Sequence, residues 1–121
     1  MNNMTNIENE KKQARLEEIF YAVDLLKSDL NKVCDSVKIS QDRNHITLDE
    51  KVAYAFDKKH LQLERRTPRH AKNLFLLQEV TDFQVTFFPE ANSILYRIEI
   101  NGKEQIRGYI FLLKYANKKE E

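Results

Sequence analysis

The chain has few of the residues and patterns that mark several large classes of protein. It holds two glycines, Gly102 and Gly108, and two prolines, which excludes a glycine-rich phosphate loop and leaves no room for a flexible linker. Its single cysteine cannot form an internal disulfide. No apolar run approaches the roughly 18 residues of a membrane-spanning helix, and positions 1–15 are mostly polar. As written, we therefore expect the chain to be neither secreted nor membrane-spanning.

Charged side chains are abundant but nearly balanced. The 121 residues include 20 basic and 19 acidic side chains, which gives a net charge of +1. Such a balance provides no overall attraction to nucleic acid or anionic lipid, so any basic binding surface has to be local. The length is that of one domain with one modest core.

The first part of the chain has the apolar spacing of one long amphipathic helix. We predict a helix over residues 5–36, followed only by strands. Apolar residues recur there at steps of three and four, as one buried stripe requires: Leu16, Ile19, Phe20, Val23, Leu26, Leu30, Val33, Cys34 and Val37. Because Cys34 is in phase with this stripe, it is predicted to be a small buried residue rather than a redox or metal site.

The start of this helix differs from the rest. Ile7 stands almost alone among charged residues before Leu16, so the first turns are predicted to be solvated, frayed or laid against another molecule. A helix of about 30 residues is also about 45 Å long, more than a sheet of this size can cover. We therefore divide the chain into a polar helix start or juxtamembrane stretch, residues 1–15, and one globular domain, residues 16–121.

Beyond the helix the apolar period changes to two, which predicts antiparallel strands with one face on a core. The alternating segments are Val37–Ile39, Ile46–Leu48, Val52–Phe56, Leu61–Leu63, Phe83–Phe87 and Tyr96–Ile100. Asn101-Gly102 is the strongest hairpin signal, since a type I′ turn needs positive φ at both centres. Asp57-Lys58-Lys59 predicts a weaker turn, residues 67–73 a loop, and residues 103–113 the last strand. The predicted fold class is α+β, with a long helix packed on an antiparallel meander.

Candidate catalytic and metal-binding residues are sparse. His45, His60 and His70 lie in separate segments without metal-ligand spacing, and no nucleophile motif occurs. Asp29 lies on the helix with two other aspartates, Asp24 and Asp35, and with Lys27 and Lys32 among them. We interpret these aspartates as ordinary surface pairs, the alternative being carboxylates for acid–base catalysis. The prediction is a protein without catalysis, metal or cofactor.

One segment concentrates positive charge, and we call residues 65–72 the basic segment. With Tyr54 and Phe56 on the adjoining strand, it could bind a phosphate backbone and stack a base. The acidic Glu64 and Glu79 nearby favour instead a solvated strand end and loop.

The order of these elements resembles the type IV pilin-like minor pseudopilins, most closely the competence-system pseudopilin of the ComGF type and more distantly the J-type minor pseudopilin of type II secretion. The resemblance covers residues 16–113. It rests on the strands 37–40 and 52–56, on the closing hairpin, and on three short sequence segments. These segments are Leu26-Lys27-Ser28-Asp29-Leu30-Asn31-Lys32-Val33, Leu61-Gln62-Leu63-Glu64-Arg65-Arg66 and Leu76-Leu77-Gln78-Glu79-Val80-Thr81-Asp82-Phe83.

The resemblance implies a non-catalytic filament subunit whose helix packs among helices of other minor and major pseudopilins, in a system that takes up DNA or secretes protein. It also implies anchoring in the cell membrane at the extracytoplasmic face or cell surface. The chain departs from the family because no basic leader, cleavage site or apolar segment is present. The explanations we weigh are a truncated chain, a start codon placed too far downstream, and a stand-alone domain with the same fold.

Two surfaces are candidates for partner contact. One is the helix start with Ile7, Ala14 and Leu16, and the other is the basic segment, through Arg65, Arg66, Arg69, His70 and Lys72. Direct contact with DNA is a weaker expectation. The alternative function is a soluble cytoplasmic module that binds nucleic acid or a protein through the basic segment.

Overall fold

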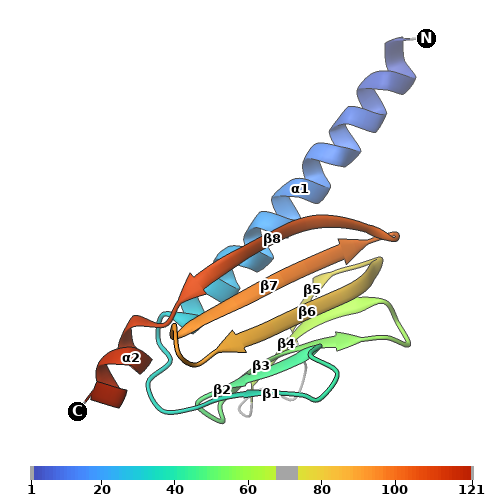
Figure 1. The fold of residues 1–121 in the computed structure, drawn as a ribbon. Coiled ribbons are helices and arrows are strands. Elements are labelled where there is room, and N and C mark those ends of the chain that lie inside the picture. The colour runs from blue at the N-terminus through green and yellow to red at the C-terminus, as the bar shows by residue number, and fades with distance from the viewer. Residues whose placement is uncertain (1, 68–73, 121) are drawn as a thin grey trace.

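The computed structural model describes the backbone of residues 2–67 and 74–120, and the side chains of residues 10–67 and 74–117. The predicted α+β class is confirmed: a long N-terminal helix precedes antiparallel strands (Figure 1). The elements are α1 (Asn2–Leu30), β1 (Val37–Ile39), β2 (His45–Leu48), β3 (Val52–Asp57), β4 (Gln62–Arg66), β5 (Leu74–Leu77), β6 (Val80–Phe88), β7 (Ser93–Ile100), β8 (Lys103–Phe111) and α2 (Leu113–Glu120).

The strands form two sheets rather than the single meander that the alternation suggests. One sheet has the order β1-β2-β3-β4-β5 and the other β6-β7-β8, with antiparallel pairing throughout. The chain changes sheets just after β5, where Glu79 has a left-handed φ of 60°. Two backbone hydrogen bonds join β6 to loops of the first sheet, from Val80 to Leu61 and from Val85 to Arg43, both at 2.9 Å.

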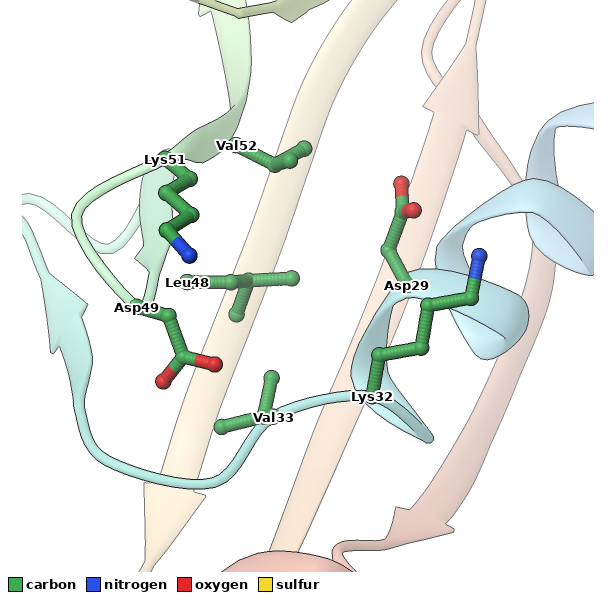
Figure 2. A pocket seen from close by; sticks show the side chains of 7 residues that line it. All are labelled: Asp29, Lys32, Val33, Leu48, Asp49, Lys51 and Val52. Carbon is green, nitrogen blue, oxygen red and sulfur yellow. The ribbon is translucent and has the colours of Figure 1, made fainter.

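Helix α1 ends at Leu30 and not at Ser36 as predicted. Its last turn tightens, because the amides of Lys32 and Val33 bond to carbonyls three residues back. The Asp49 carboxylate then accepts the amides of the next three residues, Cys34, Asp35 and Ser36. These side-chain hydrogen bonds reach across from the β2–β3 turn to the end of α1 (Figure 2) and replace the backbone bonds that a longer helix would form, so Cys34 lies in a connecting loop. Cys34 is also partly exposed, so the prediction that it is a buried helical residue is wrong.

The buried face of α1 is narrower than the apolar stripe. Ile19, Val23, Leu26 and Leu30 are buried as predicted, and Ala22 joins them. Leu16 and Phe20 are 45% and 54% exposed, so their assignment to the buried stripe is wrong. At about 100° per residue both lie on the flank of the buried arc. The helix also runs well beyond the sheets toward its N-terminus (Figure 1).

The core lies between α1 and the inner faces of both sheets. Its largest fully buried side chains are Tyr54, Phe83, Ile19, Leu30, Ile46, Leu63, Leu77, Ile94, Ile98 and Leu112. Strand β7 shows the strictest alternation, with every second residue from Ile94 to Ile100 buried. One buried ring, that of Tyr96, lies over Gly108 on the neighbouring strand.

Two tight turns set the strand register. Asn101 and Gly102 have φ of 51° and 80°, which confirms the predicted hairpin between β7 and β8. A second turn of the same kind joins β2 to β3 without glycine, through Asp49 and Glu50 at φ of 51° and 59°. Sequence analysis did not identify it, because Glu50 stands where the second positive φ angle usually calls for glycine.

The chain does not end in a strand. Strand β8 stops at Phe111, and α2 follows, so the prediction of strands alone after the first helix is wrong. Leu112 and Ala116, four residues apart, are both buried, and the ring of Tyr115 meets that of Phe87 edge-on at 5.7 Å. This helical spacing of apolar contacts favours a helix at this end of the core. Neither helix, over the residues described, is long and apolar enough to cross a membrane.

Candidate functional site

The part of α1 that packs on the sheets also carries exposed apolar side chains on its flank. Leu16 and Phe20, four residues apart, lie on one face of the helix, which we call the Leu16/Phe20 face. Ala14 and Tyr21 are also exposed but lie on the opposite side of the helix. The predicted contact residues Ala14 and Leu16 therefore belong to different faces. Ile7 lies in α1, but its side chain is outside the described residues.

Side chains tie α1 to two turns at the point where it leaves the sheets. Arg15 lies 2.6 Å from the Glu79 carboxylate, which also accepts a hydrogen bond from the Asn101 amide group at 3.1 Å. These hydrogen bonds, that from Asn101 first and that from Arg15 next, lower the pKa of Glu79. The three groups come from α1, the β5–β6 turn and the β7–β8 turn, so they form a surface network between the helix and the two turns.

An ionic cluster lies under the other end of the helix. Asp29 on α1 is only 8% exposed and accepts a hydrogen bond of 2.5 Å from the Tyr54 hydroxyl. Arg65 on β4 donates to the same carboxylate from Nε at 2.8 Å and from Nη2 at 3.2 Å. Tyr54 and Arg65 are cross-strand partners. The interpretation of Asp29 as an ordinary surface residue is therefore wrong.

The electrostatics of this cluster favour one protonation state. Burial, followed by the hydrogen bond to Asp29, raises the pKa of Tyr54 well above its usual range. The hydrogen bond from Arg65 to Asp29 is the main reason that the pKa of Arg65 is raised. The cluster thus pairs a charged arginine and a neutral tyrosine with one carboxylate, which suits the joining of helix to sheet rather than proton transfer.

The sequence held one signal for this cluster. Asp29 comes three residues after Leu26 and next to Leu30, both on the buried arc of the helix, and Tyr54 occupies an inward position of its strand. Neither observation identifies the partner, because Arg65 is 36 residues further along the chain.

The described part of the basic segment has intramolecular partners. Arg65 bonds to Asp29, and Arg66 bonds to Glu64 at 3.0 and 3.1 Å. The ring of Tyr54 is fully buried, so it cannot stack a base in this conformation. Phe56 is partly buried against the core. Three predicted contact residues, Arg69, His70 and Lys72, lie outside the described residues.

The histidines lie in separate places. His45 is on β2, where burial and then the charge of Arg66 lower its pKa. His60 is in the β3–β4 turn, with Nδ1 2.6 Å from Asp57 Oδ2. His70 is outside the described residues. Over the part of the chain that is described, no three His, Cys, Asp or Glu side chains are grouped as metal ligands.

Comparisons of the chain with protein-family models, curated proteins and solved structures find no match. The architecture, an N-terminal helix followed by antiparallel sheets, is consistent with a pilin-like fold and is not specific to it.

Proposed function

We propose that this protein is a non-catalytic structural subunit, a minor pseudopilin, of a type IV pilus-like filament that serves DNA uptake or secretion. Two observations on α1 carry the proposal: the helix projects beyond the sheets toward its N-terminus (Figure 1), and just after the projecting turns its flank exposes the Leu16/Phe20 face. Its partners are other minor and major pseudopilins.

Burial energetics support a packing role for this face. Two large apolar side chains about half exposed, next to each other on the flank of a long helix, are typical of a surface that is covered by another helix. Covering a side chain of this size contributes about 1–2 kcal/mol. The buried residues Ile19, Val23 and Leu26 hold the helix at a fixed angle to the sheets, and a fixed angle suits a subunit that repeats along an axis.

The location in the cell follows from the same proposal. A subunit of this kind is held at the extracytoplasmic face of the membrane by an apolar helix that precedes the globular domain. The competing function, a cytoplasmic module that binds through the basic segment, is less well supported because Arg65 and Arg66 are paired within the chain.

The test combines localisation with substitution on the native protein in its source cells. Fractionation and mass determination should find a membrane-bound form with apolar residues ahead of Met1. The variants Leu16→Asp and Phe20→Asp should lose co-purification with the other filament subunits while their thermal unfolding is unchanged, since both residues are exposed.

The matched control is Tyr109→Asp, which places the same charge on a 69% exposed side chain of β8, away from the projecting helix. A cytosolic protein that begins at Met1, or full filament association of both helix variants, would overturn the proposal.

A further inference from the structure

Strand β8 forms an open edge of the second sheet. Within the described part of the chain β8 pairs with β7 alone, at one side of the order β6-β7-β8. The opposite edge is closed in part, because the amides of Val80 and Val85 on β6 bond to loops of the first sheet. An edge strand presents a row of unpaired backbone donors and acceptors, which is a template for another strand. The edge of β8 is therefore a candidate binding surface.

The hydrogen bonds between β7 and β8 tell which backbone groups face this edge. Leu112 lies opposite Asn92 when the register of the two strands is extended by one pair, and its N–H donates to the Asn92 carbonyl at 2.7 Å. Along an antiparallel strand, residues that bond to one neighbour alternate with residues whose N–H and C=O point the other way. Residues 110 and 108 therefore bond toward β7. The residues whose backbone groups point to the open edge are Arg107, Tyr109 and Phe111.

The two halves of this edge differ in charge and regularity. The first half has an irregular register against β7 and carries three charged side chains: Lys103, Glu104 and Arg107. Charges and irregular pairing both commonly protect an edge strand. Residues 108–111 carry no charge and pair regularly with β7. The second half of β8 is therefore the part that can accept another strand.

Aromatic side chains flank this second half. Tyr109 and Phe111 are 69% and 52% exposed, and the Tyr109 ring lies 6.4 Å from that of Phe88 on β6, which is 41% exposed. At about 200 Å² for each aromatic side chain, the three together expose about 300 Å². A stable complex of two folded domains buries about 800 Å² on each partner. The patch is therefore too small for docking of a second folded copy and fits a short segment.

An extended segment is the occupant that matches these groups. Its alternating N–H and C=O groups complement those at the open edge of β8. Helix α1 passes behind β8 and continues past this edge (Figure 1), so inward side chains of an added strand would face the helix and should be apolar. Its outward side chains would stand beside Tyr109 and Phe111, where β-branched residues pair well with aromatic rings.

We propose that the second half of β8 binds an extended segment of a protein partner as an additional antiparallel strand, with apolar side chains inward and β-branched side chains outward. The antiparallel direction continues the pairing of β6, β7 and β8. The proposal does not rest on the filament proposal, because it uses backbone groups of β8 and is tested with a peptide rather than with filament subunits.

The experiment follows amide hydrogen exchange and chemical shifts of the whole, isotope-labelled protein. The probe is the peptide acetyl-Glu-Thr-Val-Thr-Val-Thr-Glu-amide, in which threonine and valine alternate and the end charges favour solubility. Binding should slow exchange of the amides of Arg107, Tyr109 and Phe111 about tenfold or more. The amides of residues 108 and 110, already bonded to β7, should change little.

Two methylated peptides test the hydrogen bonds without any change to the protein. Residues directly opposite each other in an antiparallel pair have side chains on the same face, so the threonines bond to β8 and the valines do not. The peptide methylated on the backbone nitrogens of two threonines should bind about tenfold or more weakly. The matched peptide, methylated on the nitrogens of its two valines, should keep most of its affinity.

A pair of variants tests the same bonds from the side of the protein. Proline is tolerated on an edge strand where its nitrogen faces away from the neighbouring strand. Tyr109→Pro and Tyr109→Thr both remove the aromatic ring, but only the proline removes the outward N–H. Tyr109→Pro should therefore bind the unmethylated peptide about five- to tenfold more weakly than Tyr109→Thr. Should Tyr109→Pro fail to fold, the methylated peptides decide on the unaltered protein.

Three results would overturn the proposal. They are equal binding of the two methylated peptides, unchanged exchange of the three outward amides at millimolar peptide, and slowing of those amides by a higher concentration of the protein alone. The last result, together with a doubled mass in sedimentation, would assign the edge to a second copy of the chain.

Discussion

Replacing Asp29 by alanine tests whether the buried ionic cluster holds α1 on the first sheet. The carboxylate accepts three hydrogen bonds, one from Tyr54 and two from Arg65. Removing one partner of a buried ion pair costs about 3–5 kcal/mol, because the other charge stays buried without a counterion. The Arg65 side chain is 22% exposed, so water can reach part of its charge. We therefore expect the lower end of that range, a loss of about 3 kcal/mol.

A graded series makes this prediction sharper. Asp29→Asn keeps an oxygen that can accept the Tyr54 hydroxyl but removes the charge opposite Arg65, so it should cost about 1–2 kcal/mol. Asp24→Asn is the control: Asp24 lies on the same helix but is exposed, and its substitution should change the free energy of unfolding by less than about 0.5 kcal/mol.

Urea denaturation gives the free energy of unfolding for each variant, and an unchanged slope shows that the unfolded states are comparable. The reasoning is refuted if Asp29→Ala is no less stable than Asp24→Asn. An equal loss for the alanine and asparagine variants would show that the hydrogen bond from Tyr54 contributes nothing.

Three further predictions concern the core. Gly108→Ala should cost about 1–3 kcal/mol by overpacking, because its Cβ would lie 2.7 Å from the hydroxyl oxygen of the buried Tyr96; an unchanged melting temperature would contradict this. Because the pKa of Tyr54 is raised from 10.0 in the folded state, stability should fall as pH rises above about 10, where only the unfolded tyrosine loses its proton. Urea titrations on both sides of that pH should show a weaker fall in Tyr54→Phe. Leu30→Asp buries an unpaired charge at a fully buried site and should cost about 4 kcal/mol or more, whereas unchanged thermal unfolding would show that the helix face is misassigned.

Local patterns were sufficient to predict the first helix and most of the strands, but not α2. Alternation with a period of two identified the strands from β1 to β4 and β6 to β7, since each has one face on the core. The Asn101-Gly102 pair predicted its hairpin, because its positive φ angles are a local requirement. The period of the helix identified Ile19 and Leu30 as buried. Each of these features depends on residues within a few positions of one another.

Only the tertiary structure decided where the helix ends, which of its apolar residues stay exposed, and what Asp29 does. Asp49 lies 13 to 15 positions further along the chain and accepts the amides of residues 34–36, which keeps these residues out of the helix. Leu16 and Phe20 have the spacing of core residues but face no sheet, because periodicity gives the direction of a side chain and not the extent of the surface opposite it. Asp29 meets Arg65 only because folding brings β4 under the helix. A contact between residues far apart in the chain leaves no periodic trace in either segment, so the candidate sites of this protein emerge only when its strands are paired.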